Sequence, residues 1–149
     1  MLTGWHHIGD VESVEKGENQ IDIYCNQARV RITVLGADLI RVRMTSKSTF
    51  EKDYSWAVVK TEWDPVNVQI RETDKMVELR TKEVTVVVQK QPCRIKFLTP
   101  DGMVVNQDDP SKGMGWDGAQ IRCWKNLQNR ELFFGLGEKA GPIEKHGKS

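Results

Sequence analysis

The stretch NQIDIYCNQARVRITVLGADLIRVRM, residues 19–44, decides the fold class of this chain. Apolar and polar residues alternate along three of its segments, residues 21–25, 29–34 and 40–44. A period of two places the apolar side chains on one face of a strand and the polar ones on the other. Such half-buried strands are typical of antiparallel sheets. The stretch therefore predicts three consecutive antiparallel strands.

Two turns set the register of these strands. A two-residue turn at 26–27 and a three-residue turn at 36–38 place all the apolar side chains on one face. Asp22 then lies opposite Arg31, and Arg31 lies opposite Arg43, on the other face. Facing arginines repel each other, and Asp22 would offset that repulsion. We expect this charged face to be solvated, and a slip of one residue would bury arginines.

The rest of the chain repeats the pattern. Alternating segments occur at residues 66–70, 77–79, 83–89 and 94–97, with turn signals between them, and no window of twelve residues shows a helical period. We predict an all-β fold with little or no helix, an antiparallel β-sandwich. Residues 108–110 and 113–116 are interpreted as a long loop, and residues 119–127 and 131–137 as two final strands.

Composition excludes several classes of partner. The chain has 22 basic and 21 acidic residues, a net charge of +1, which provides no field for nucleic acid or an anionic membrane. No apolar run approaches the ~18 residues of a membrane span, and the first residues do not resemble a signal peptide. The widely spaced Cys25, Cys93 and Cys123 are typical of free thiols in a reducing compartment. We therefore expect a cytoplasmic protein.

Metal and phosphate sites have little support. No CxxC, HExxH or Cys/His cluster occurs, and His6 and His7 would point to opposite faces of a strand. The glycine-rich segment GLGEKAG at 135–141 lacks the spacing of both nucleotide-binding fingerprints, and no helix pattern follows it. We predict no cofactor and no metal.

Carboxylates and tryptophans leave two readings open. Paired carboxyl groups could cleave a glycosidic bond, but the sequence fixes no pair, and Asp108-Asp109 before a proline favours a turn. The other acidic candidates are Asp117, Glu131 and Glu138. Tryptophan faces could stack on sugars, although packing in a core or interface is favoured for each. The five tryptophans are Trp5, Trp56, Trp63, Trp116 and Trp124.

The segment FFGLGEKAGPIEKHGK, residues 133–148, resembles glycoside hydrolase family 31, the α-glucosidase family. Members carry an aromatic-Gly-Leu-Gly-Glu-(Lys/Arg)-x-Gly-Pro segment at the end of an N-terminal β-sandwich. Upstream, ADLIRVRM at 37–44 and QPCRIKFLTPDGMVVNQDD at 91–109 are also similar to the family. The resemblance spans most of the chain.

This resemblance implies a galactose-mutarotase-like sandwich at residues 1–134 and a glycine-rich linker at 135–149. The linker would lead toward a catalytic (β/α)8 barrel that is absent from this chain. The family's two catalytic aspartates lie on that barrel, so no catalytic residue is expected here. A loop next to the substrate is expected at Gly135, Gly137, Glu138, Lys139 and Gly141.

The implied function is that of an N-terminal, non-catalytic domain of a retaining α-glucosidase. Such an enzyme hydrolyses terminal α-linked glucose from oligosaccharides, and the domain would support the barrel and shape the substrate entrance. The expected partners are the barrel and the oligosaccharide, and a homo-oligomer is possible. The alternative is a stand-alone carbohydrate-binding or protein-interaction module. Trp116, Trp124, Phe133 and Phe134 are candidates for an apolar interface with the barrel.

Overall fold

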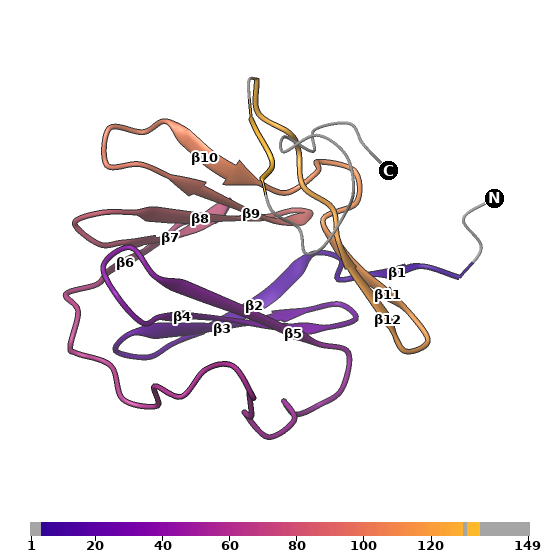
Figure 1. Cartoon of the computed structure of the whole chain (residues 1–149). Helices are drawn as coiled ribbons and strands as arrows, with labels where there is room; N and C mark the ends of the chain where they lie inside the picture. The colour runs from indigo at the N-terminus through magenta and orange to yellow at the C-terminus, as the bar shows by residue number, and fades with distance from the viewer. Residues whose placement is uncertain (1–3, 130, 135–149) are drawn as a thin grey trace.

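The computed structural model describes residues 4–129 and 131–134. This part of the chain forms twelve β-strands and no helix, so it also contains no helix able to cross a membrane (Figure 1). The predicted all-β fold is confirmed. The strands are β1 (His6–His7), β2 (Val11–Lys16), β3 (Gln20–Cys25), β4 (Arg29–Val34), β5 (Ile40–Thr45), β6 (Gln69–Glu72), β7 (Met76–Arg80), β8 (Thr85–Lys90), β9 (Cys93–Leu98), β10 (Val104–Gln107), β11 (Met114–Asp117) and β12 (Gln120–Cys123).

Two antiparallel sheets form the sandwich. The first has the order β2-β3-β4-β5 and the second has the order β10-β9-β8-β7-β6. They lie face to face in Figure 1, with the apolar inner faces between them. The core takes alternate residues of the central strands, namely Ile21, Ile23, Val30, Ile32 and Val34 from the first sheet and Val77, Leu79, Val86, Val88 and Ile95 from the second.

The predicted register of the first sheet is confirmed. The Cys25 amide donates to the Ala28 carbonyl at 2.8 Å across the two-residue turn, and Leu35 donates to Leu39 at 2.9 Å across the three-residue turn. Asp22 pairs with Arg31, and Arg31 pairs with Arg43. The period of two and the turn lengths were therefore sufficient to align β3, β4 and β5.

A third, small sheet closes one end of the sandwich, with the order β1-β11-β12 (Figure 1). The prediction that residues 113–116 belong to a loop was wrong, because Met114–Asp117 is β11. Its one glycine allows close pairing: a Cβ on Gly115 would lie 2.4 Å from the His6 carbonyl oxygen. Glycines at 113 and 115 favoured a loop, but the strand pairs with β1 on one side and with β12 on the other.

Two other predicted strands differ in extent. β6 begins at Gln69 rather than Val66, although Val66 and Val68 pack against the core before it. The final strand at 131–137 is not observed over its described part, since residues 131–134 lie in none of the twelve strands. Residues 135–137, and the predicted linker at 135–149, lie outside the described residues.

Candidate interaction surfaces

The predicted substrate-adjacent loop lies outside the described residues, and so does the candidate carboxylate of Glu138. The residues of that loop are Gly135, Gly137, Glu138, Lys139 and Gly141. The other candidate carboxylates can be placed. Over residues 4–129 and 131–134, no cluster of three or more histidine, cysteine, aspartate or glutamate side chains could hold a metal ion.

Asp108 is a buried carboxylate that links two segments of the chain. Its residue is 5% exposed, its Oδ2 accepts a hydrogen bond from the Ile95 amide at 2.8 Å, and its Oδ1 lies 2.7 Å from the Lys125 ammonium. The carboxylate thus ties β9 to the chain that follows β12. Both oxygens have partners, which is how a buried charge is compensated.

The neighbouring carboxylates hold turns or remain at the surface. Asp109 Oδ1 accepts hydrogen bonds from the Ser111 and Lys112 amides at 2.9 Å, which confirms the predicted turn. Hydrogen bonds from Ser111 are the main reason that the pKa of Asp109 lies below its ordinary value. Asp117 is exposed at the end of β11, and Glu131 accepts from the Gln128 amide at 2.9 Å. Asp108 and Asp109 therefore serve separate structural contacts.

The charged face of the first sheet is not solvated as expected. Asp22 is 6% exposed, and its two oxygens accept hydrogen bonds from Arg31 Nε at 2.8 Å and Arg31 Nη2 at 2.9 Å. Arg29 Nε lies 3.3 Å from Asp22 Oδ1, without an aligned hydrogen bond. Burial alone would raise the pKa of Asp22, but the Arg31 and Arg29 contacts outweigh burial and hold that pKa below its ordinary value.

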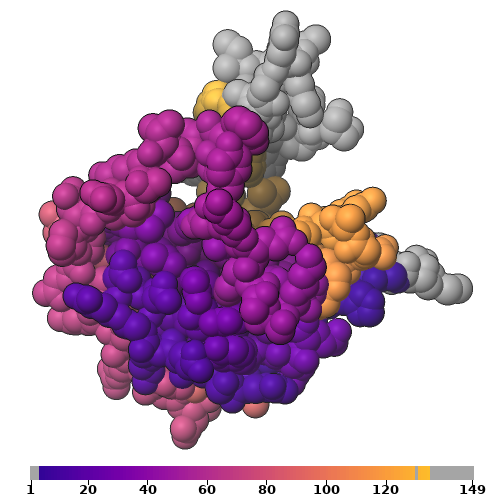
Figure 2. Space-filling view, turned by 90° about the horizontal axis from the view of Figure 1, so that it is seen from below, coloured from indigo at the N-terminus to yellow at the C-terminus, as the bar shows by residue number. Residues whose placement is uncertain are grey.

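A loop covers this face. Residues 46–68 connect β5 to β6, and Phe50 lies 5.0 Å from the guanidinium carbons of both Arg31 and Arg43. Arg29 reaches the same ring at 5.3 Å. Figure 2 views the molecule from this side, with the loop in purple and magenta lying over part of the indigo sheet. The arginine side chains therefore contact the Asp22 carboxylate and the Phe50 ring. The alternation of the sequence could not predict the contact with Phe50.

The tryptophans do not belong to the buried core, which was one of the two packing environments expected for them. None of the five is buried, and Trp116 only packs against the edge of the core. Three gather around the small sheet, where Trp5 meets Trp124 edge-on at 5.1 Å and His6 stacks on Trp116 at 5.6 Å. His7 is 5.5 Å from Trp124, so the two histidines contact different tryptophans.

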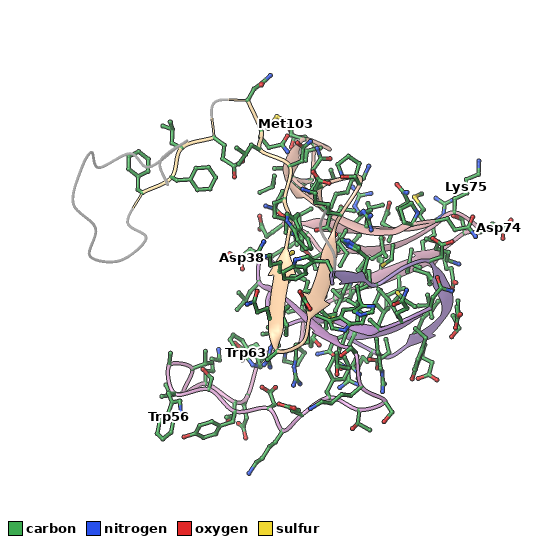
Figure 3. All side chains as sticks on the ribbon, turned by 90° about the vertical axis from the view of Figure 1, so that its right-hand side faces the viewer. Asp38, Trp56, Trp63, Asp74, Lys75 and Met103 are labelled. Atoms are coloured by element: carbon green, nitrogen blue, oxygen red, sulfur yellow. The ribbon has the colours of Figure 1, made fainter. Side chains whose placement is uncertain are left out.

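Exposed apolar side chains occur on β10 and on the chain that follows β12. Residues after β12 continue antiparallel to β10, as the hydrogen bond from the Asn126 amide to the Gln107 carbonyl shows. Figure 3 places Met103 at this end of the molecule. The name β10 patch denotes the exposed apolar side chains of these two segments, namely Met103, Val104, Val105, Leu127, Leu132 and Phe134, all at least 38% exposed.

The β10 patch overlaps only partly with the interface predicted from sequence. Phe134 is 59% exposed, whereas Trp116, Trp124 and Phe133 are half-buried. Val104 and Val105 were not among the predicted interface residues, which were chosen from the strands and loop nearest the glycine-rich segment. Their exposure follows from the position of β10 at the edge of its sheet.

A cleft of about 620 Å³ lies against the second sheet. Met76 and Val87 supply apolar walls, and polar side chains such as Gln89, Gln107 and Asn126 supply the remainder. The two carboxylates that line it are Asp74 and Asp108, and Asp108 is already bound to Lys125. The cleft therefore lacks two free carboxyl groups for glycoside hydrolysis.

Comparison with known proteins identifies similar sequences and structures. Residues 29–149 match the family described as the glycosyl hydrolase 31 N-terminal galactose mutarotase-like domain. The chain is 28% identical over 143 residues to alpha-glucosidase 2 of Bacillus thermoamyloliquefaciens. That match covers 95% of this chain but only 18% of the relative, so the chain spans less than a fifth of that protein's length.

Two solved structures share the fold. A family 31 dextranase of Flavobacterium johnsoniae, complexed with glucose, matches with a TM-score of 0.87 at 24% identity, over 96% of this chain and 18% of that one. A cycloalternan-forming enzyme of Listeria monocytogenes, in complex with a pentasaccharide substrate, matches with a TM-score of 0.78 at 19% identity, over 97% and 14%.

Proposed function

Because the chain belongs to the galactose mutarotase-like N-terminal domains of glycosyl hydrolase family 31, we propose that it is the non-catalytic domain of a retaining α-glucosidase. The enzyme would hydrolyse terminal α-linked glucose from oligosaccharides on a (β/α)8 barrel encoded outside these residues. The observation that carries the proposal is the alignment of 95% of this chain with 18% of a protein named as an α-glucosidase.

The placement of the described carboxylates is compatible with a non-catalytic role. Retaining hydrolysis needs two carboxyl groups about 5–5.5 Å apart, one on each side of the scissile bond. Asp108 holds β9 and Lys125, while Asp109 holds a turn, so neither is available to a substrate. Barrel enzymes place their catalytic groups at the C-terminal ends of the barrel strands. Catalysis would accordingly belong to the barrel.

The β10 patch supports a packing role. Several large apolar side chains left exposed in one part of a domain are typical of a surface that a partner covers. The patch includes Phe134, which adjoins the glycine-rich segment at 135–149 in sequence. We assign the patch to the contact with the barrel and residues 135–149 to the linker. Gly135, Gly137, Glu138, Lys139 and Gly141 would then lie at the substrate entrance.

The setting proposed for the enzyme is the cytoplasm. Cys25 and Cys93 are buried free thiols, and Cys123 is an exposed one. Free thiols persist in a reducing compartment. The oligosaccharide would be the binding partner of the complete enzyme. Self-association of that enzyme into a homo-oligomer is a separate proposal, which its mass in solution would test.

An activity assay tests the proposal. The complete reading frame that contains residues 1–149 should yield a protein that releases glucose from maltose or an aryl α-glucoside, with the α-anomer formed first. Residues 1–149 alone should release none. Initial release of the β-anomer, no release by the complete protein from any α-glucoside, or genuine turnover by residues 1–149 would each overturn it.

A further inference from the structure

The loop at residues 46–68 presents an aromatic pair that the proposed packing role does not use. Loops of this length without helix or strand are uncommon in compact domains and are often functional. The loop leaves the first sheet at β5 and enters the second at β6. A direct connection between those strands would not require such a long excursion, so its middle section needs an explanation of its own.

The base of the loop is firmly attached. Phe50 lies under Arg31 and Arg43, and the Arg43 side chain donates to the Glu51 carbonyl at 2.8 Å. Arg41 forms a two-point ion pair with Asp53. Bidentate arginine–carboxylate pairs fix geometry as well as charge. The attachment ends at Asp53, one residue before the aromatic pair begins.

Tyr54 and Trp56 stand beyond that attachment with their rings open to solvent. Trp56 is 90% exposed and Tyr54 is 63% exposed. Their ring centroids lie 5.1 Å apart and their planes meet at 86°, so the two rings pack edge to face in a right-angled corner and leave their outer faces open. Ser55 Oγ accepts hydrogen bonds from the Ala57 and Val58 amides, which shapes the turn between them. Figure 3 shows Trp56 at the outer end of the loop, away from the sheets.

This corner has the chemistry of a sugar subsite. One face of a pyranose ring carries C–H groups that pack on the negative face of an aromatic ring, while hydroxyl groups surround its edge. The Tyr54 hydroxyl makes no hydrogen bond with the described residues and can donate to such an edge. We propose that Tyr54 and Trp56 bind one glucose ring of an α-glucan, and the choice of glucan rests on the proposed function.

Affinity electrophoresis of residues 1–149 tests this subsite. The native chain should migrate more slowly in a gel that contains dextran or glycogen than in a glucan-free gel. Trp56→Ala should weaken the apparent affinity about tenfold or more, since ring stacking of this kind contributes on that scale. Tyr54→Phe should weaken it less, because the ring remains. Trp56 is exposed, so the far-ultraviolet circular dichroism of the variant should match that of the native chain.

Val59→Ser is the matched control, because Val59 is 91% exposed on the same loop but has no ring. Its retardation should equal that of the native chain. Equal losses from Val59→Ser and Trp56→Ala would indicate general apolar docking, as on a protein partner, and overturn the subsite. So would a native chain that shows no retardation, or a Trp56→Ala variant that shows undiminished retardation.

The result is separable from the fate of the proposed function. A complete protein without glucosidase activity would contradict the proposed function, and Trp56-dependent retardation of residues 1–149 would still establish the subsite. An active enzyme whose isolated domain shows no retardation would leave the proposed function standing and remove the subsite.

Discussion

Asp22 is the residue whose environment most affects the stability of the first sheet. Its side chain is 8% exposed and lies within ion-pair distance of Arg31 and Arg29, both on β4. Removing one partner of a buried pair leaves the other charges uncompensated, and that loss exceeds the net contribution of the pair. Arg31 in turn faces Arg43 on β5, so the loss would leave two guanidinium groups opposed.

We therefore expect Asp22→Ala to lower the free energy of unfolding by about 2–3 kcal/mol, more than an exposed pair would contribute. Urea denaturation at neutral pH measures the difference. Asp64→Ala is the control, since Asp64 is exposed in the loop and should change stability by no more than about 0.5 kcal/mol. Similar unfolding midpoints for the two variants would show that the ion pairs of Asp22 contribute little to the free energy of unfolding.

The same carboxylate should produce a pH dependence. The folded-state pKa of Asp22 lies below its ordinary value of 3.8, so its contribution is complete above that value and is lost as the pH falls through the folded pKa. The stability gap between the native chain and Asp22→Asn should therefore narrow below about pH 4. A gap that stays constant down to pH 2 would contradict the assigned ion pair.

Thiol reactivity provides a second test at the residue scale. Cys25 and Cys93 are buried, and contact with Cys25 together with burial raises the pKa of the Cys93 thiol far above its ordinary value. Only a thiolate attacks a disulfide reagent rapidly. An aromatic disulfide reagent should thus label Cys123 first and the other two only after unfolding. Labelling of all three at one rate in the native chain would be inconsistent with this core.

At the scale of elements, the small sheet depends on a glycine. A Cβ on Gly115 would lie 2.4 Å from the His6 carbonyl oxygen, so Gly115→Ala must separate β1 from β11. We expect a loss of about 1–3 kcal/mol, the usual cost of overpacking. The near-ultraviolet signal of Trp5, Trp116 and Trp124 should also change, since those rings gather on this sheet.

Gly17→Ala is the matched control for this prediction. The nearest atom to a Cβ on Gly17 belongs to the flexible side chain of Gln20, at 3.2 Å, and this side chain can move. Stability and the aromatic signal should both be retained. A Gly115→Ala variant with the same unfolding midpoint as Gly17→Ala would mean that β1 and β11 pair less closely than described.

These elements also show what a sequence can and cannot predict. The pairing of Asp22 with Arg31 followed from the period of two and turn length, because both are local and a slip would bury arginines. β11 was missed because Gly113 and Gly115 favoured a loop, although the strand pairs with its neighbour β12 as well as with β1. Phe50 covers the arginines because the long loop at residues 46–68 folds back over the sheet. The period of the strands carries no information about the path of that loop.

At the scale of the whole molecule, the described residues include two groups of exposed apolar side chains to which we assign different roles. The β10 patch combines exposed aliphatic side chains of the edge strand β10 with Phe134 of the chain after β12, a composition suited to packing against another domain. The corner formed by Tyr54 and Trp56 is aromatic and stands on an anchored loop. We propose that the catalytic barrel of a larger enzyme buries the β10 patch, and that this chain is a domain of that enzyme.

Hydroxyl-radical footprinting of residues 1–149 and of the complete protein tests that claim directly. Met103 and Phe134, which are 62% and 59% exposed, should be oxidised readily in residues 1–149 and protected in the complete protein. Trp56 should remain reactive in both. Equal oxidation of Met103 and Phe134 in the two proteins would contradict the assignment of the β10 patch to the barrel contact.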